Sequence, residues 1–310
     1  MAPAHLRYPI VLSVAAAVFT LALKGLAYYI TDSIGLLSEA VESLVNLVAA
    51  VTALISLYYA SKPIDSTHTY GHEKIEFFSS GLEGALILVG VPWICWCAIQ
   101  RLAAPAELTQ LSLGTAISLL ASLVNLAVAR VLLRVGRRHG SIVLEADGRH
   151  LMTDVWTSVG VVAGLGLVWL TGRVWVDPII AMLVAANIAW TGIDLVRISF
   201  NGLMDHALPE VEQLAVRSAV ESRLKPGMDY HALRTRKAGS RRFVDFHLLV
   251  PGAMSVGRAH EITAEIEEAV RQALPGIEVT VHIEPIEDRS AWEDSELVAI
   301  ERAARQSKIE

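Results

Sequence analysis

The first two-thirds of the chain carries little charge for its length. Residues 1–202 contain 12 Lys/Arg and 13 Asp/Glu, whereas residues 203–310 contain 14 and 19. Overall the chain is 53% hydrophobic and 19% charged, while soluble domains are about 45–50% apolar and about 25% charged. The shortage of charge excludes an ordinary soluble protein and divides the chain near residue 203.

Other absences exclude whole classes of chemistry. The only cysteines, Cys95 and Cys97, lie in an apolar run, which argues against a disulfide framework and a thiolate site for copper(I). The chain has no basic stripe for nucleic acid, and we expect no organic cofactor. It contains neither a GxxxxGK[ST] loop for ATP nor an HExxH motif, so direct ATP coupling and a metal-dependent membrane hydrolase are disfavoured.

Long apolar runs take the place of charge. A membrane-spanning helix needs about 20 mostly apolar residues, and six segments qualify: 8–30, 34–60, 76–101, 111–134, 144–171 and 175–200. Positive side chains gather on one side of these segments: Arg7, Lys62, Lys74, Arg134, Arg137, Arg138 and Arg197. The positive-inside rule therefore predicts a multi-pass protein of the cell (inner) membrane, embedded in the lipid bilayer with both termini cytoplasmic.

The pattern changes after Leu203 to that of a small α+β domain. Helices are expected at 209–224 and 256–274, and strands at 230–237, 242–250 and 277–284, the first two joined as a hairpin. This α-β-β-α-β order predicts a two-layer domain. We therefore expect a transmembrane domain over 1–203, a cytoplasmic domain over 204–287 and a polar tail over 288–310 that forms one more helix.

Polar side chains inside two of the apolar segments form the main candidate site. Glu39, Glu42 and Asn46 are spaced i, i+3, i+7 in the second segment, and Asp147, His150 and Asp154 repeat the spacing in the fifth. Each set shares one helical face, and ionisable groups at membrane depth need a functional or structural reason. The inner four offer oxygen and nitrogen ligands suited to zinc, iron(II), manganese or cobalt: Glu42, Asn46, His150 and Asp154.

The competing interpretation of these groups is structural, because polar side chains also hold membrane helices together by hydrogen bonds. Two acids, an imidazole and an amide in matched spacing favour the metal site instead. Since metal ligands must lose their protons to bind, metal and protons compete for such a site. Proton exchange is therefore the expected driving force.

Several motifs together resemble the cation diffusion facilitator family over about residues 8–286. They are Ser33-Ile34-Gly35-Leu36-Leu37 with Glu42-Ser43-Leu44-Val45-Asn46, Asp65 and His68 with Tyr70-Gly71-His72-Glu73-Lys74, and His150-xxx-Asp154. The resemblance implies a homodimeric metal/proton antiporter that exports zinc, iron(II), manganese, cobalt or cadmium from the cytoplasm. It also implies a cytoplasmic domain of the ferredoxin-like, metallochaperone-like kind.

The chain departs from the family pattern at two ligand positions. Family members usually have Asp or His, and then Asp four residues later, where this chain has Glu42 and Asn46. The quartet then carries two formal negative charges instead of three, which leaves the ion preference open. We expect Glu39 or Asp147 to supply the missing charge from one turn away.

Two further groups are predicted to bind metal. Asp65, His68 and His72 are by themselves typical of a solvated polar loop, but the resemblance implies a second metal site there. The cytoplasmic domain contains more histidines and acids than its size predicts: His231, His247, His260, His282 and Glu284. The resemblance implies that metal sites in this domain tie two subunits together, in a regulatory or structural role.

One charge pair is a candidate for assembly. Lys74 and Asp205 are expected at the cytoplasmic surface, where an ion pair within or between subunits would set the hinge between the two domains; two solvated rim charges are the alternative. For the protein as a whole, secondary transport is the main prediction, with no enzymatic activity. The alternatives are a membrane-anchored metal sensor and a metal-dependent membrane hydrolase.

Overall fold

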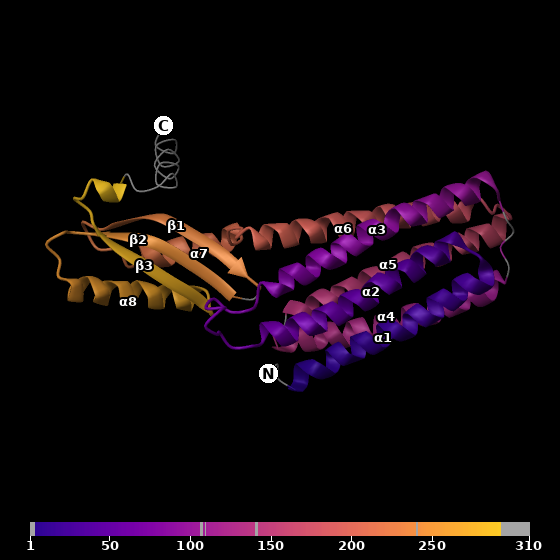
Figure 1. The fold of residues 1–310 in the computed structure, drawn as a ribbon, viewed down its shortest axis with the longest axis horizontal. Helices are drawn as coiled ribbons and strands as arrows, with labels where there is room; N and C mark the ends of the chain where they lie inside the picture. The colour runs from indigo at the N-terminus through magenta and orange to yellow at the C-terminus, as the bar shows by residue number, and fades with distance from the viewer. Residues whose placement is uncertain (1–3, 106–107, 109, 140–141, 240, 293–310) are drawn as a thin grey trace. The chain divides into compact units, whose positions relative to one another are not determined.

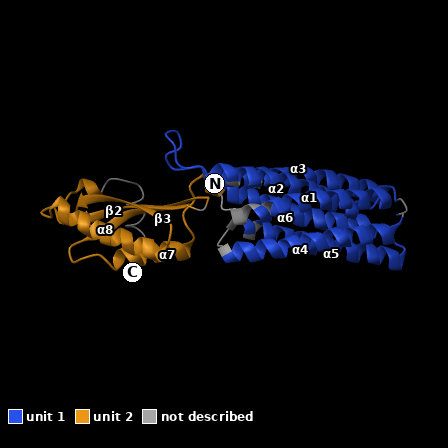
Figure 2. Cartoon of the chain, turned by 90° about the horizontal axis from the view of Figure 1, so that it is seen from below, with its two compact units in different colours: residues 1–200 blue, residues 201–310 orange. Residues whose placement is uncertain are grey.

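The computed structural model describes residues 4–292 apart from 106–107, 109, 140–141 and 240. The chain forms two compact units, Met1–Phe200 and Asn201–Glu310 (Figure 2). The helix predicted in the tail falls on residues 293–310, outside the described residues.

Unit 1 consists of long helices that run alongside one another (Figure 1). They are α1 (Ala4–Thr31), α2 (Ile34–Ala60), α3 (Ile75–Ala103), α4 (Leu111–His139), α5 (Ile142–Thr171) and, ending in unit 2, α6 (Val176–Leu203). All six are long and apolar enough to cross a bilayer. The prediction of six membrane-spanning helices is confirmed.

Helix packing brings the polar faces of α2 and α5 towards each other. Helix α2 contacts α1, α3 and α5, and α4 packs against both α1 and α5. Helices α3 and α6 approach each other closely at Gly84, where an added Cβ would lie 2.7 Å from the carbonyl oxygen of Gly192. Here glycine permits close packing, as expected for membrane helices.

The start of α2 is held by a side chain from α6. Asp177 accepts hydrogen bonds from the Ser33 hydroxyl (2.5 Å), the Ile34 N–H (2.7 Å) and the Gly35 N–H (3.2 Å). The first N–H groups of a helix have no partner within the helix, and a carboxylate is the favoured acceptor there. Asp177 is 2% exposed, so this cap lies in the interior and anchors the helix that carries Glu42 and Asn46.

Unit 2 is a three-stranded sheet with two helices on one face. Its elements are α7 (Glu210–Glu221), β1 (Asp229–Ala238), β2 (Arg241–Val250), α8 (Val256–Ala273), β3 (Ile277–Pro285) and the short helix η1 (Ser290–Trp292). The strand order is β1-β2-β3, antiparallel between β1 and β2 and parallel between β2 and β3. The predicted α-β-β-α-β order is confirmed.

The core of unit 2 shows which face of the sheet the helices cover. Val216 of α7 and Ile262 of α8 pack with Val244, Phe246 and Leu248, alternate residues of β2. Because side chains alternate across a strand, the residue between the last two, His247, points to the opposite face. The face of the sheet that carries His247 is thus the one that α7 and α8 leave uncovered.

One ion pair of unit 2 leads to a pH-dependent prediction. Arg242 of β2 donates two hydrogen bonds to Glu212 of α7, at 2.8 and 3.0 Å. These bonds lower the pKa of the Glu212 carboxyl, so their stabilisation is present above its unfolded value and is lost as pH falls through the folded one. We expect Glu212→Gln to destabilise unit 2 at pH 7 by about 0.5–1 kcal/mol.

Hydrogen exchange of β2 amides, followed by mass spectrometry on the intact chain, measures this difference. The difference should shrink as pH falls through the lowered pKa of Glu212, where the carboxyl of the parent protein also becomes protonated. Glu210→Gln, on the same helix, removes an equal charge and serves as the control. A difference between parent and Glu212→Gln that is unchanged from pH 7 to pH 3 would contradict the assignment.

Candidate metal sites

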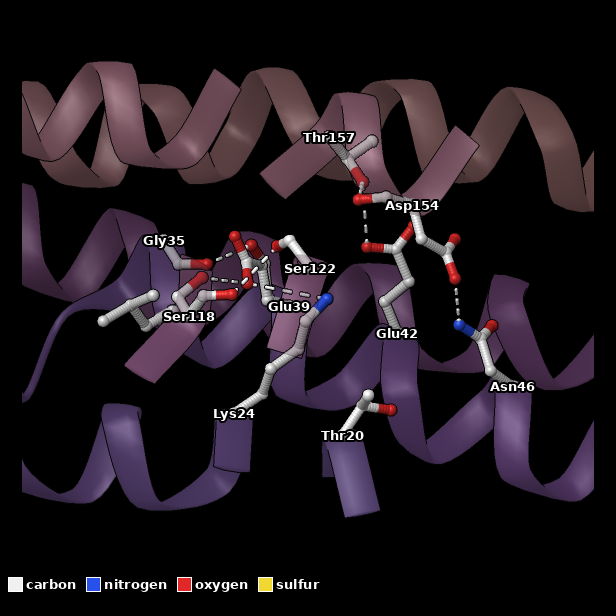
Figure 3. Close-up of polar contacts among 12 residues, drawn as sticks. Thr20, Lys24, Gly35, Glu39, Glu42, Asn46, Ser118, Ser122, Asp154 and Thr157 are labelled. Atoms are coloured by element: carbon white, nitrogen blue, oxygen red, sulfur yellow. Dashed lines mark hydrogen bonds and ion pairs between the residues drawn. The ribbon is translucent and has the colours of Figure 1, made fainter. Parts of the chain in front are cut away.

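The four residues of the predicted transport site meet between α2 and α5. The Asn46 amide donates a hydrogen bond from Nδ2 to Asp154 Oδ2 at 2.5 Å, and His150 Nε2 lies 2.8 Å from Asn46 Oδ1. Glu42 accepts a hydrogen bond from the Thr157 hydroxyl at 3.4 Å, so it lies beside Asp154 (Figure 3). Thus the two helical faces meet as the i, i+3, i+7 spacing predicted.

These side chains are largely removed from solvent. Glu42 and Asn46 are each 7% exposed and Asp154 is 1% exposed. Asp154 Oδ1 is buried without a hydrogen-bond partner among the residues that the structure describes. An unmet carboxylate oxygen at this depth is costly unless a cation or proton binds it, which makes Asp154 the most strongly indicated metal ligand of the four.

A cavity of about 20 Å³ borders the quartet, enough for one water-sized occupant. It is lined by α2 and α5 on one side and by α3 and α6 on the other: Val41, Glu42, Val45, Asn46, Ile87, Gly90, Val91, Ile94, His150, Thr153, Asp154, Asn187, Ile188 and Thr191. Residues of all four helices, α2, α3, α5 and α6, therefore border the same small cavity.

The two predicted auxiliary acids lie differently from the quartet. Asp147, half-buried on α5, hydrogen-bonds with Ser13 of α1. Glu39 accepts a hydrogen bond from Ser118 of α4 and lies 3.5 Å from the Lys24 ammonium. The contacts of both acids thus lead to α1 or α4 rather than into the quartet, and their supply of charge to a metal stays a prediction.

A third acid reaches the quartet from α3. Glu83 Oε1 lies 3.7 Å from His150 Nε2. The position of Glu83 in the sequence gives no reason to connect it with His150. Only the packing of α3 against the other helices brings the Glu83 carboxylate to His150.

The predicted loop group is brought together after α2. His72 Nε2 lies 3.2 Å from one oxygen of Asp65, and His68 Nδ1 lies 3.2 Å from the other. Asp65 also accepts hydrogen bonds from the Thr67 hydroxyl and from the Thr67 and His68 N–H groups, which lower its pKa. One ligand atom from each of the three residues lies within 4.8 Å of the others, a spacing that fits one metal ion.

The histidines of unit 2 form a row across the sheet. His231 of β1 pairs in register with His247 of β2, which pairs with His282 of β3. Glu284 lies 3.1 Å from His231, 3.2 Å from His247 and 3.4 Å from His282. His231, His247 and Glu284 offer three ligand atoms within 4.8 Å, and the buried His231 Nδ1 has no hydrogen-bond partner among the described residues.

Local backbone geometry helps to orient the His231 side chain towards His247 and Glu284. The β1–β2 register shifts between His231 and Arg234, and Ala232 has a φ of 50°. Bulges next to functional sites re-aim side chains, and a non-glycine residue in the left-handed region costs about 1 kcal/mol or more. Trp292 of η1 covers His231, with ring centroids 5.5 Å apart.

His260 is the one predicted histidine of unit 2 that the structure does not bring to this group. It lies exposed on α8, and α8 packs on the face of the sheet opposite to His247. The role of His260 as a metal ligand stays a prediction, and it would need a metal bound away from the histidine row or a ligand from a second subunit.

The predicted pair of Lys74 and Asp205 also stays a prediction. Lys74 immediately precedes α3, while Asp205 lies 3.5 Å from Arg236 in unit 2.

Six apolar helices around a cluster of carboxylate, amide and imidazole side chains, joined to a small α+β domain, describe a multi-pass membrane protein with a candidate metal site. The sequence models of two domains match almost the whole chain: the cation efflux transmembrane domain over residues 10–204 and the cation efflux protein cytoplasmic domain over residues 208–286. The chain belongs to the cation diffusion facilitator family, a family of cation-efflux transporters and not of enzymes.

Relatives agree with this assignment along most of their length. The uncharacterized transporter sll1263 of Synechocystis is 47% identical over 283 residues, 91% of each chain. The cation-efflux pump FieF of Serratia proteamaculans is 30% identical, over 87% of this chain and 90% of its own. Among solved structures, the metal-bound C-terminal domain of the CzcD transporter from Thermotoga maritima is 28% identical, covering 26% of this chain and 100% of its own, with a TM-score of 0.23.

Proposed function

We propose that the protein exports a divalent transition-metal ion from the cytoplasm in exchange for protons, with Glu42, Asn46, His150 and Asp154 as the transport site. The convergence of these side chains at one buried point between α2 and α5 carries the proposal. Zinc suits the mixed oxygen and nitrogen ligands best, with iron(II), manganese, cobalt and cadmium as other candidate substrates.

In this proposal the metal replaces the hydrogen bond between Asn46 and Asp154. The Asn46 amide now donates to Asp154, so it must turn its oxygen towards the ion for both side chains to act as ligands. The carboxylates and the imidazole bind either the metal or protons. Protons arriving from the outer side therefore release the ion, and metal binding from the cytoplasm releases protons.

The proposed topology places both termini and unit 2 in the cytoplasm, in a homodimer in the inner membrane. The matched cytoplasmic and transmembrane domains of a cation-efflux family support it. Lys62 and Lys74 between α2 and α3, and Arg134, Arg137 and Arg138 in the last turns of α4, also support it by the positive-inside rule. Helices α1, α2, α4 and α5 would rock against α3 and α6, since the quartet and its cavity lie between these groups.

Flux through proteoliposomes tests the proposal. Uptake of zinc, iron(II), manganese, cobalt and cadmium is measured with and without a pH gradient across the membrane. We expect the gradient to drive transport of one or two of these metals and a matching proton flux to appear in the opposite direction. Metal uptake that is indifferent to the pH gradient would overturn the exchange, and no uptake of any metal would overturn the transport function.

The histidine row of unit 2 is proposed to bind metal in a regulatory or structural role. In purified full-length protein we expect His247→Ala to weaken zinc binding at this site at least about tenfold, because even second-shell partners of a metal contribute 10–100-fold. Equilibrium dialysis measures the loss. His206→Ala, which removes an exposed histidine of the same unit, is the control, and equal zinc binding by the two variants would exclude the site.

A further inference from the structure

The membrane unit contains a second buried charged group that the proposed transport site does not use. Lys24 of α1 and Glu39 of α2 are both 0% exposed, and the Lys24 ammonium lies 3.5 Å from Glu39 Oε2. Ser118 of α4 donates a hydrogen bond to the same oxygen at 2.8 Å. The group therefore joins three helices, as Figure 3 shows.

The pair is incompletely satisfied for its depth. Among the described residues, Lys24 Nζ and Glu39 Oε1 have no hydrogen-bond partner. A buried ion pair gains little net stability over apolar side chains of similar volume, since its desolvation offsets its attraction. In a membrane helix a lysine is costlier still. Helix packing alone does not account for the pair, which points to a role in transport.

Its position relative to the quartet suggests that role. Glu39 lies one helical turn before Glu42 on α2, and Figure 3 shows Lys24 and Glu39 beside the Glu42–Asp154 group. Glu42 and Asp154 together carry two formal negative charges, which one divalent ion neutralises. An unpaired Glu39 would add a third carboxylate within a turn of this site.

We propose that Lys24 is the counter-charge that holds Glu39 out of the metal site, so that the site presents two carboxylates to a divalent ion. The inference rests on the proposed transport function and assigns Lys24 as a positioning residue that tunes the affinity and release of the metal. It also gives Glu39 a role different from the auxiliary ligand that the sequence predicts.

The two charges should then act in opposite directions. Lys24→Met leaves Glu39 uncompensated, so its carboxylate turns to the metal; the KM for zinc falls at least about tenfold and kcat falls because release is slower. Glu39→Gln leaves an unpaired ammonium near the site and raises the KM at least about tenfold. The double variant Lys24→Met/Glu39→Gln removes both charges and returns the KM to within about threefold of the parent.

Zinc flux in proteoliposomes, at several zinc concentrations, gives the KM and kcat of each variant. The double variant is decisive even if a single variant fails to fold, because a buried pair replaced as a whole is tolerated far better than one that is broken. A KM that stays at least tenfold high in the double variant makes Glu39 a metal ligand and overturns the proposal. An unchanged KM in both single variants would mean that the Lys24–Glu39 pair has only a structural role, and this result would also overturn the proposal.

The proposed function fails by a different result. Unchanged zinc flux in Asp154→Asn would remove the quartet as the transport site, whatever the Lys24 and Glu39 variants show. If Asp154→Asn abolishes zinc flux, the transport site stands. A KM that stays high in the double variant, or that is unchanged in both single variants, would then remove only the proposed role of Lys24.

Discussion

Asp154→Asn is expected to lower metal transport at least 100-fold while leaving the protein folded. Asparagine has the shape of aspartate and can still meet the Asn46 side chain, but it cannot carry the negative charge that faces the metal. The carboxylate of Asp154 is 1% exposed and one of its oxygens has no hydrogen-bond partner in the described part of the chain. The uncharged amide leaves Glu42 as the only carboxylate of the quartet.

The measurement is initial zinc flux into proteoliposomes at equal protein content, with thermal unfolding in detergent to verify the fold. Glu268→Gln is the matched control, since it neutralises one acid on the exposed surface of α8. We expect the control to transport like the parent. Flux of Asp154→Asn within threefold of the parent would show that the metal crosses elsewhere.

Asp177→Ala is expected to destabilise the membrane unit by about 3 kcal/mol, because it leaves several buried donors without an acceptor and each costs about 1–3 kcal/mol. Those donors are the Ser33 hydroxyl and the N–H groups of Ile34 and Gly35. Asp177→Asn retains one acceptor oxygen, and its expected loss is smaller, about 1–2 kcal/mol. Since the cap anchors α2, transport should fall in parallel with stability.

Thermal unfolding of detergent-purified protein ranks the variants. Asp32→Asn is the control at a nearby position: Asp32 lies just before α2 and pairs with Arg101 at 2.6 Å, but its side chain is 56% exposed. Exposed pairs contribute about 0–1 kcal/mol, so its unfolding temperature should hardly change. The expected order of stability is Asp32→Asn, Asp177→Asn, Asp177→Ala, and a different order would mean that the cap does not hold α2.

Residue spacing predicts some of the candidate metal groups but not others. Glu42 with Asn46, and His150 with Asp154, each share one helical face, so periodicity was enough to predict that the two faces could meet. Spacing alone favoured a solvated polar loop for Asp65, His68 and His72, and only the family resemblance implied a site there. His282 and Glu284 are two residues apart on β3 and therefore share one face of the sheet. The row from His231 through His247 to His282 depends on strand register, which a two-residue alternation leaves open and which pairing across the sheet decides.

Tertiary packing also decided which charges became partners. Lys24, Glu39 and Glu83 are all visible as charges within apolar segments, yet their spacing does not say which helix each one faces. Residues three apart on a helix differ by about 60° in direction, so Glu39 turns to α1 and α4 while Glu42 turns to α5. Similarly, His260 lies on the helical layer and not with the histidine row, because α8 covers the opposite face of the sheet.

The sequence by itself determined that six segments span the membrane, that an α+β domain follows them, and which residues of α2 and α5 form the candidate metal site. These conclusions depend on hydrophobicity, periodicity and ligand chemistry, which are properties of short stretches of chain. Only the tertiary structure decided that Asp177 caps α2, that Lys24 pairs with Glu39, and that Glu83 approaches His150. Each of these contacts joins side chains from different helices, and the distance between such helices is set by the packing of the whole bundle.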